Sequence, residues 1–220
     1  METNVMNIIV FGATGDIGSR IVSEALQRGH KVTAVTRNEA AFSRLPDGVK
    51  PVAANLSDAD KVASVMTGHD LAITALRPPT GEEAQLPVLT QAVVQGAAHH
   101  QMRVLIVGGA ARLMIPGTDG ETVLNAEGFL PASAVEIARA CQVQYEQCLT
   151  SQDVIWSYLS PTAMIAPGTR TGQYTLGTDT LVTDSDGQSR ISMEDFAVAM
   201  LDEAETPKHL QQAFTVGYGT

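Results

Sequence analysis

The chain has very little cysteine, which argues against a fold stabilised by disulfide bonds and against one stabilised by a metal site. Only two of the 220 residues are cysteine, Cys141 and Cys148, and they lie seven apart in a predicted helix. Seven helical residues separate their Cα atoms by about 10 Å, which is too far for a disulfide bond. No histidine stands at ligand spacing from a cysteine or carboxylate. We therefore expect two reduced thiols and no metal site.

Basic residues are also scarce. The chain has 14 lysines and arginines against 24 aspartates and glutamates, for a net charge of −10. Nucleic acids and anionic membranes bind basic surfaces, so neither is expected as a partner. The chain contains no apolar run long enough to cross a bilayer, and its first residues lack the basic region of a signal peptide. We therefore expect a cytoplasmic protein.

What the chain does have is a glycine-rich stretch close to its N-terminus, NIIVFGATGDIG. Ile8 to Phe11 form an unbroken apolar run, which is typical of a strand buried on both faces. Glycines follow at positions 12, 15 and 18, and apolar residues then recur at helical spacing. A strand, a glycine turn and a helix in this order predict a site that binds a dinucleotide.

Each glycine of this turn has its own expected role. Gly12 allows the tight turn, Gly15 lets the backbone approach a diphosphate, and Gly18 lets the helix pack close to the strand. The free N–H groups and the dipole at the helix start favour the phosphate charge. The alternative is a structural turn on an α/β sheet whose site has been lost. The predicted contacts are Gly12, Ala13, Thr14, Gly15, Asp16, Ile17 and Gly18.

A cofactor preference is indicated after the second expected strand, residues 32–35. Dinucleotide folds read the adenosine ribose at this point, where a carboxylate accepts from the 2′-OH of NAD and an arginine can hold the 2′-phosphate of NADP. Here the chain places Arg37, and the first acid is Glu39. We therefore expect NADP(H), with NAD(H) as the second choice. The alternative is that Arg37 is a solvated loop charge, or stacks on adenine without choosing between the cofactors.

Strands and helices alternate along the rest of the chain, which predicts one α/β domain over residues 1–220, a doubly wound parallel sheet of the Rossmann NAD(P)-binding fold. Strands are expected at 49–54, 70–76, 104–107, 154–159 and 212–216, with helices at 58–66, 83–99, 133–149 and 192–205. Ser133 and Ser192 open the last two helices in capping boxes. Asn55 and Leu56 follow the third strand and Leu76 ends the fourth, so all three are expected at the cofactor. Residues from about 160 to 220, with β segments at 174–176 and 181–182, form a substrate-side elaboration.

One connection breaks this rhythm. Residues 110–132 contain three glycines and two prolines with scattered apolar residues. A connection this long is more often functional than idle. It begins where a buried strand ends, so it could cover the nicotinamide end of a cofactor as a substrate lid. The alternative is a packed structural loop.

The residues of one familiar reaction are missing. Carbonyl reductases of this fold use a tyrosine as acid with a lysine four residues on, which lowers the tyrosine pKa. An acceptor that takes hydride without a proton donor from the protein is therefore favoured, such as a flavin or a quinone. No catalytic residue is assigned. The tyrosines are at 145, 158, 174 and 218, and none has a lysine at that spacing, because the only lysines are Lys31, Lys50, Lys61 and Lys208.

The chain resembles a known family along nearly its whole length. The segment VFGATGDIGSRIVSEALQRGHKVTAVTRN is similar to the N-terminus of the atypical short-chain dehydrogenases, in their NmrA-like, NAD(P)H-binding group. PGTRTGQY and SRISMEDFA resemble the C-terminal half of proteins called NADH-flavin reductases, relatives of the biliverdin/flavin reductases. The resemblance implies a Rossmann domain with NAD(P)H at the glycine turn, and it adds two cofactor contacts, Gly108 and Pro161.

These observations favour an NADPH-dependent reductase that passes hydride to a flavin, a quinone or a similar small conjugated acceptor. The first alternative is a redox-sensing module that binds NADP(H) without turnover and passes its state to a partner protein. An epimerase or dehydratase acting on a nucleotide sugar is disfavoured, because such enzymes normally use the tyrosine and lysine that are missing here. A homodimer is compatible with the sequence but is not specified by it.

Overall fold

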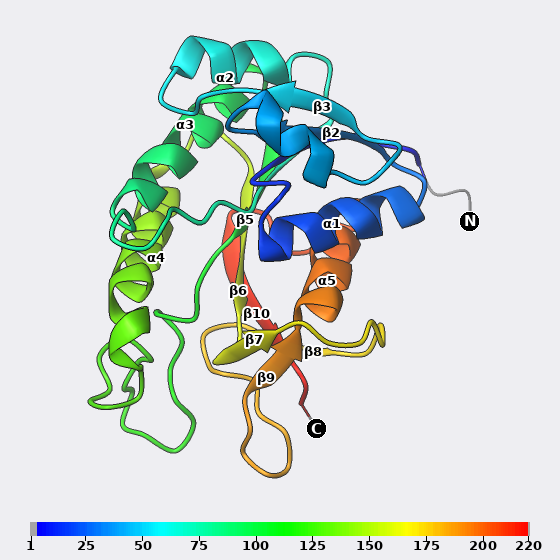
Figure 1. Ribbon diagram of the computed structural model, residues 1–220. Coiled ribbons are helices and arrows are strands. Elements are labelled where there is room, and N and C mark those ends of the chain that lie inside the picture. The colour runs from blue at the N-terminus through cyan, green and yellow to red at the C-terminus, as the bar shows by residue number, and fades with distance from the viewer. Residues whose placement is uncertain (1–3, 220) are drawn as a thin grey trace.

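The computed structural model describes residues 4–219, and its centre is a sheet of eight strands (Figure 1). The strand order is β3-β2-β1-β4-β5-β6-β10-β8, and every neighbouring pair is parallel except β10 with β8. This arrangement confirms the doubly wound Rossmann fold. The strands are β1 (Asn7–Phe11), β2 (Lys31–Thr36), β3 (Lys50–Ala53), β4 (Leu71–Thr74), β5 (Arg103–Val107), β6 (Trp156–Pro161), β8 (Thr175–Gly177) and β10 (Gln212–Gly217).

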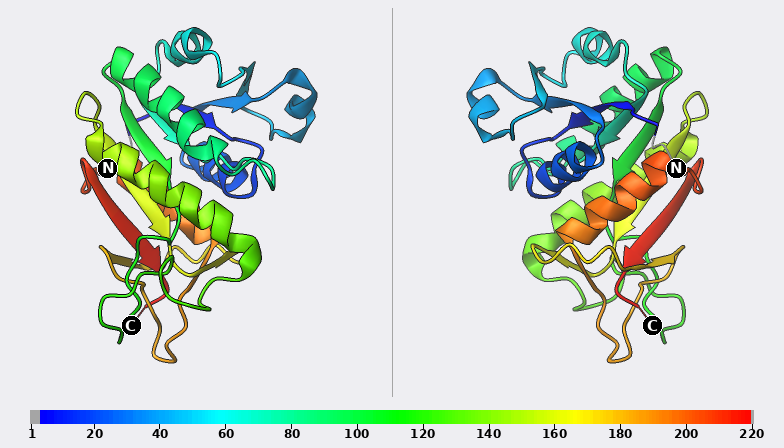
Figure 2. Two further views of the ribbon diagram at one scale, coloured as in Figure 1. Left: turned by 90° about the vertical axis from the view of Figure 1, so that its left-hand side faces the viewer. Right: turned by 90° about the vertical axis from the view of Figure 1, so that its right-hand side faces the viewer.

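Helices cover both faces of the sheet (Figure 2). α1 and α5 pack on one face, while α2, α3 and α4 pack on the other. Along β1, Ile8 and Val10 belong to the first core and Ile9 and Phe11 to the second, and all four are fully buried. Within residues 4–219 no helix is both long and apolar enough to span a membrane. The helices are α1 (Asp16–Gln27), the 3-10 helix η1 (Glu39–Arg44), α2 (Ala59–Met66), α3 (Gln85–His99), α4 (Ala132–Thr150) and α5 (Met193–Glu205).

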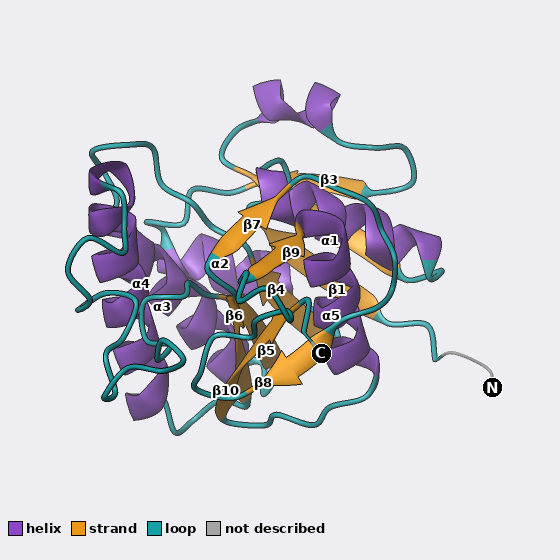
Figure 3. Cartoon of the chain, turned by 90° about the horizontal axis from the view of Figure 1, so that it is seen from below, coloured by secondary structure: helices purple, strands orange, loops and turns teal. Residues whose placement is uncertain are grey.

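The order of the strands reverses between β1 and β4. After β3 at one edge of the sheet, the chain crosses to the far side of β1, so β1 and β4 are neighbours although β2 and β3 lie between them in sequence. In an open parallel sheet, a ligand binds at such a point, outside the carboxyl ends of the strands. Figure 3 looks onto that end of the sheet.

Residues beyond β6 add a small second sheet. β7 (Met164–Ala166) and β9 (Arg190–Ser192) pair in parallel just past the carboxyl ends of the main strands (Figure 1). The sequence did not predict this pair. The β segment expected at 174–176 is confirmed as β8, but the one expected at 181–182 is wrong. Leu181 instead packs in a small core with Leu113 and Val123, so burial in that core accounts for its apolar character.

The two serine caps expected from the sequence have opposite outcomes. Ser192 caps α5, because its side chain accepts a hydrogen bond from the Asp195 amide at 3.0 Å. The cap at Ser133 is wrong, since α4 already begins one residue before it and Pro131 holds the capping position. Proline has the fixed φ that suits a helix entrance, and its carbonyl accepts a helix amide at 2.8 Å, so the helix starts before the serine.

The long connection of residues 110–132 is packed against the C-terminal part of the chain. Met114 forms a bridge to Thr122 within the connection and another to Thr180. Arg112 makes an ion pair with Asp179, with an N–O distance of 2.6 Å. These contacts support the packed-loop alternative, and a role as a lid stays a prediction.

Candidate functional site

The glycine turn lies at the crossover between β1 and β4. Gly12 has a φ of +80°, which favours glycine, and its carbonyl accepts from the Gly15 amide at 3.0 Å. A Cβ built on Gly12 would lie 2.4 Å from the carbonyl oxygen of Ala75, just past the end of β4. The backbone after β1 therefore passes directly against the backbone after β4, and only glycine fits this approach.

The other two glycines are under different constraints. A Cβ on Gly18 would lie 2.1 Å from the Gly12 oxygen, so helix α1 touches the turn at this point. A Cβ on Gly15 would meet that same oxygen at 3.3 Å, which is tight but possible. Gly15 is exposed and lies just before the first residue of α1. Gly18 is thus needed for packing, whereas Gly15 leaves an open surface.

That open surface is the beginning of α1. Gly15 is the N-cap and has no side chain, so no side-chain cap covers the first amides of the helix. Free N–H groups and the positive end of the helix dipole make such a surface suited to a diphosphate. Ala13 is buried, Thr14 and Ile17 are half-buried, and Asp16 is exposed. The seven residues expected from the sequence at this turn form one continuous segment from the end of β1 into the first turn of α1.

Two arginines lie near the carboxyl ends of β1 and β2. Arg37 follows β2 directly and is exposed. Arg44, in the last turn of η1, donates from Nη2 to the carbonyl oxygen of Thr14 at 2.8 Å. The contact brings a second cation to the glycine turn. The sequence analysis missed Arg44, because neither its spacing nor its neighbours distinguish it from an ordinary surface arginine.

Residues that follow β3 and β4 lie at the same carboxyl end of the sheet as the glycine turn. Asn55 is exposed, and its Oδ1 accepts from the Ser57 amide at 3.1 Å. Leu56 and Leu76 are half-buried against the same hydrophobic core. The structure therefore brings these three predicted residues to the same end of the sheet as the glycine turn, as parallel strands require.

The last two predicted residues, Gly108 and Pro161, lie at the carboxyl ends of β5 and β6. Gly108 follows β5, and a Cβ there would overlap the ring of Tyr158 at 2.0 Å. Pro161 is the buried last residue of β6. The Tyr158 hydroxyl donates to the Cys141 carbonyl at 3.0 Å, and burial raises the pKa of Tyr158 well above its ordinary value. Gly108 is therefore required because a tyrosine ring occupies the space beneath it.

The other tyrosines are also occupied by structural contacts. Tyr174 bonds to Asp202, and Tyr218 donates to Asp195 at 2.6 Å. The ring of Tyr145 lies between Tyr158 and the guanidinium of Arg112, which is 5.1 Å from its centroid. Over the described residues, none of the four hydroxyls has a hydrogen bond to a lysine.

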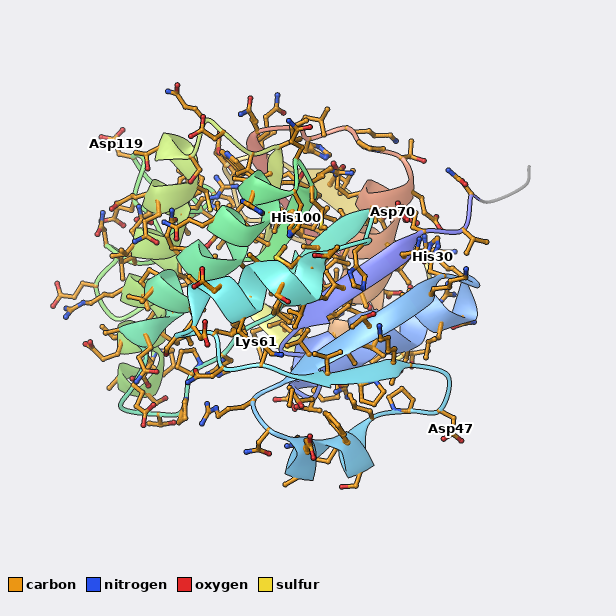
Figure 4. All side chains as sticks on the ribbon, turned by 90° about the horizontal axis from the view of Figure 1, so that it is seen from above. His30, Asp47, Lys61, Asp70, His100 and Asp119 are labelled. Atoms are coloured by element: carbon orange, nitrogen blue, oxygen red, sulfur yellow. The ribbon has the colours of Figure 1, made fainter. Side chains whose placement is uncertain are left out.

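The histidines lie at the opposite end of the sheet from the glycine turn. All five come immediately or within a few residues before a strand, so they collect at the amino ends. Figure 4 labels two of them, His30 and His100. His30 Nε2 pairs with Glu205 at 3.0 Å, and His100 Nε2 bonds to the Ala63 carbonyl at 2.7 Å. Across residues 4–219, no group of three or more potential ligands is arranged to hold a metal ion.

The two cysteines are free, and both are expected to resist alkylation. Burial raises the pKa of Cys141 and of Cys148 to about 12. Since the thiolate is the reactive form, iodoacetamide at pH 8 should label the native protein at least on the order of 100-fold more slowly than the urea-unfolded protein. Mass spectrometry of timed samples measures both rates, and equal rates would contradict the burial of these thiols.

The family of the chain follows from a comparison with known proteins. A model of the NAD(P)H-binding family matches residues 12–204, from the glycine turn to the last turn of α5. The chain belongs to this family. This match confirms the resemblance to the NmrA-like, atypical short-chain dehydrogenases. Membership of the family implies a nicotinamide cofactor.

Individual members of the NAD(P)H-binding family differ in how far they are characterised. An uncharacterised Bacillus subtilis protein, YwnB, is 31% identical over 96% of this chain and 98% of its own length. A 3-diazoavenalumate denitrifying reductase from a Streptomyces species is 27% identical over 74% of this chain and 58% of its own length. The Streptomyces relative, together with the NAD(P)H-binding family, supports an oxidoreductase in general terms.

Solved structures of similar proteins show the same fold. A Burkholderia pseudomallei protein, provisionally described as exported, is 38% identical, covers 97% of this chain and 100% of its own, and has a TM-score of 0.86. A Streptococcus pneumoniae protein provisionally named an NADH-flavin reductase is 28% identical, covers 97% and 99%, and has a TM-score of 0.85. The fold is thus shared along the whole length of both chains.

Proposed function

We propose that this protein is an NADPH-dependent reductase that passes hydride to a flavin, a quinone or a similar conjugated acceptor. The observation that carries the proposal is the glycine turn at the β1–β4 crossover, where Gly15 is exposed and leaves the first amides of α1 without a side-chain cap. Bound NADPH would supply the hydride. The protein would bind and orient it over the ends of β4, β5 and β6.

An acceptor of this class fits the side chains near the proposed site. The hydroxyls of Tyr158, Tyr174 and Tyr218 are held by a carboxylate, a carbonyl or a buried amide. A conjugated ring delocalises the charge that arrives with the hydride, so water can deliver the balancing proton afterwards. The relative named as a denitrifying reductase and the one named as an NADH-flavin reductase are in line with a reductase.

The activity can be tested directly. Purified protein is mixed with NADPH and either FMN or menadione under anaerobic conditions, and NADPH absorbance is followed. We expect acceptor-dependent oxidation of NADPH, with a KM for NADPH about tenfold or more higher in Gly15→Ala. Binding of NADPH without turnover of any acceptor would instead favour the redox-sensing alternative, and a pull-down that depends on NADPH against NADP⁺ would then identify the partner.

The preference for NADPH rests on the two arginines at the adenosine end. Arg37 is exposed beside the proposed ribose position, and Arg44 is held against the turn by Thr14. Charge-assisted bonds to a 2′-phosphate are among the stronger hydrogen bonds in proteins. We therefore expect Arg37→Ala to weaken NADPH binding about tenfold or more while leaving NADH binding unchanged.

Calorimetric titration of both cofactors into wild type and Arg37→Ala measures this difference. Arg139→Ala is the matched control, because Arg139 is an exposed arginine on α4 whose only described partner is Glu136. Equal affinity of the wild type for NADPH and NADH would contradict the preference.

A further inference from the structure

Residues 167–174, here called the strap, run from β7 to β8 and contain the PGTRTGQY motif. The strap is held by carboxylates from two helices. The amides of Thr171 and Gly172 both donate to Asp195 on α5 at 2.8 Å. Arg170 makes two bonds to Glu24 on α1, at 2.7 and 2.8 Å. The strap therefore joins α1 and α5, the two helices that pack on the same face of the sheet.

A continuous chain of contacts runs from the glycine turn to the start of the strap. Arg20 on α1 donates from Nη1 to the Asp16 carbonyl at 2.9 Å. The same guanidinium donates from Nε to Glu194 Oε1 at 3.0 Å. The second oxygen of Glu194 accepts from the Gly168 amide at 2.7 Å. Three bonds thus connect a residue of the proposed diphosphate site to the segment that follows β7.

The strap end of this chain has little freedom to move. A Cβ on Gly168 would lie 2.9 Å from the Cβ of Ser192, so the backbone passes tightly against the cap of α5. Arg20 and Glu194 are mostly shielded, with side-chain exposures of 28% and 23%. Hydrogen bonds from Arg20 and the Gly168 amide outweigh burial, so the pKa of Glu194 lies below its usual value. Glu194 is therefore ionised at neutral pH and holds both partners at once.

The strap follows closely on the end of β6. Pro161, at the end of β6, is only six residues before the strap, and β7 lies between them. β7 also pairs with β9, which leads directly into α5 and Glu194. The strap, β7 and the start of α5 are thus connected to one another by strand pairing and hydrogen bonds.

We propose that Glu194 is a positioning residue that couples the diphosphate turn to the acceptor-side segment of residues 161–174. Occupation of the turn fixes the Asp16 carbonyl, which fixes Arg20, and Glu194 passes this constraint to the Gly168 amide. The cofactor thereby orders the strap, residues 167–174, through Glu194. The inference rests on the proposed function for the place of the cofactor, but not on turnover of any acceptor.

Hydrogen exchange with NADP⁺ as the probe tests this coupling. In wild type, saturating NADP⁺ is expected to slow amide exchange in a peptide spanning the strap by about fivefold or more. In Glu194→Ala, this cofactor-dependent slowing is expected to disappear. By reciprocity the affinity for NADP⁺ falls by no more than the same factor, so calorimetry can set a saturating concentration for each variant.

Two further variants separate coupling from simple loss of structure. Glu194→Gln keeps an oxygen for the Gly168 amide but loses the charge that pairs with Arg20, so it is expected to retain part of the effect. Glu136→Ala removes an exposed pair on α4 and is expected to leave the effect unchanged. A merely structural role would speed exchange equally with and without NADP⁺.

The outcomes are distinct. Wild-type protein that binds NADP⁺ without slower exchange in the strap overturns the coupling, and so does slowing that persists in Glu194→Ala. Absence of NADP⁺ binding by calorimetry overturns the proposed function and this inference together. If FMN is turned over, Glu194→Ala is also expected to raise the KM for FMN several-fold with a smaller change in the KM for NADPH.

Discussion

Alanine at position 18 is expected to weaken NADPH binding on the order of 100-fold and to lower the free energy of unfolding by roughly 3 kcal/mol. The new methyl group would lie 2.1 Å from the Gly12 oxygen and 2.9 Å from the Gly12 carbonyl carbon. Both are backbone atoms of the turn, so no flexible side chain can yield. Either α1 moves away from β1 or the turn changes shape. Calorimetric titration and thermal unfolding of Gly18→Ala measure both effects.

Gly15→Ala is the informative comparison, because it separates binding from stability. Its methyl group would meet the nearest atom at 3.3 Å, and Gly15 has a φ of −76°, which alanine adopts readily. The unfolding midpoint is therefore expected to stay close to wild type. Binding of NADPH is expected to weaken about tenfold or more, since the methyl group projects where the diphosphate approaches. Wild-type affinity in Gly18→Ala would contradict the structural role of this turn.

The second large effect is expected at Asp195, whose carboxylate is fully buried. It accepts the amides of Thr171 and Gly172 at 2.8 Å and the hydroxyls of Thr171 and Tyr218 at 2.6 Å. In asparagine an NH₂ group replaces one carboxylate oxygen. The groups that donate to that oxygen would then face another donor and have no acceptor. We expect Asp195→Asn to lower the free energy of unfolding by about 3 kcal/mol.

Urea unfolding of Asp195→Asn measures this loss. Asp60→Asn is the matched control, because Asp60 also lies in the first turn of a helix but is exposed. Its unfolding midpoint is expected to equal that of wild type within error. Equal stability of Asp195→Asn and wild type would contradict the role of this carboxylate in holding the strap.

The same carboxylate predicts how stability changes with pH. Burial would raise the pKa of Asp195, but hydrogen bonds from Thr171, Tyr218 and two amides outweigh it and hold the pKa below its ordinary value. A carboxyl whose pKa is lowered by folding stabilises the protein at pH values above about 4, where the unfolded chain is already ionised. This contribution is lost as the pH falls through the lowered value. Asp195→Asn is therefore expected to unfold with a weaker dependence on acid than wild type.

Much of the frame could be predicted from local patterns in the sequence. The run from Ile8 to Phe11 indicates a strand with two buried faces, and the structure covers both faces with helices. The glycines at 12, 15 and 18 lie where the chain needs a turn, an open surface and a close packing contact. Ser192 caps its helix as expected. Each of these features depends on residues close together in the chain, so periodicity and residue type are sufficient.

Features that depend on distant residues could not be predicted in this way. β7 and β9 have three residues each and pair across more than twenty intervening residues, so neither strand has a pattern of its own. Arg44 meets Thr14 only because β2 and η1 fold back over the turn. Ser133 has the sequence pattern of a capping box, but Pro131 holds the capping position and the helix starts before the serine. Leu181 is apolar because of a loop core that the sequence does not mark.

The most direct test of the account is a calorimetric titration of NADPH into wild type and Gly15→Ala, two proteins of expected equal stability. The account predicts saturable binding of one NADPH per chain to wild type, with a dissociation constant on the order of 10 μM, and binding at least about tenfold weaker in the variant. Equal affinity in the two proteins, or no heat from wild type up to millimolar NADPH and NADH, would contradict the claim that the glycine turn holds the dinucleotide.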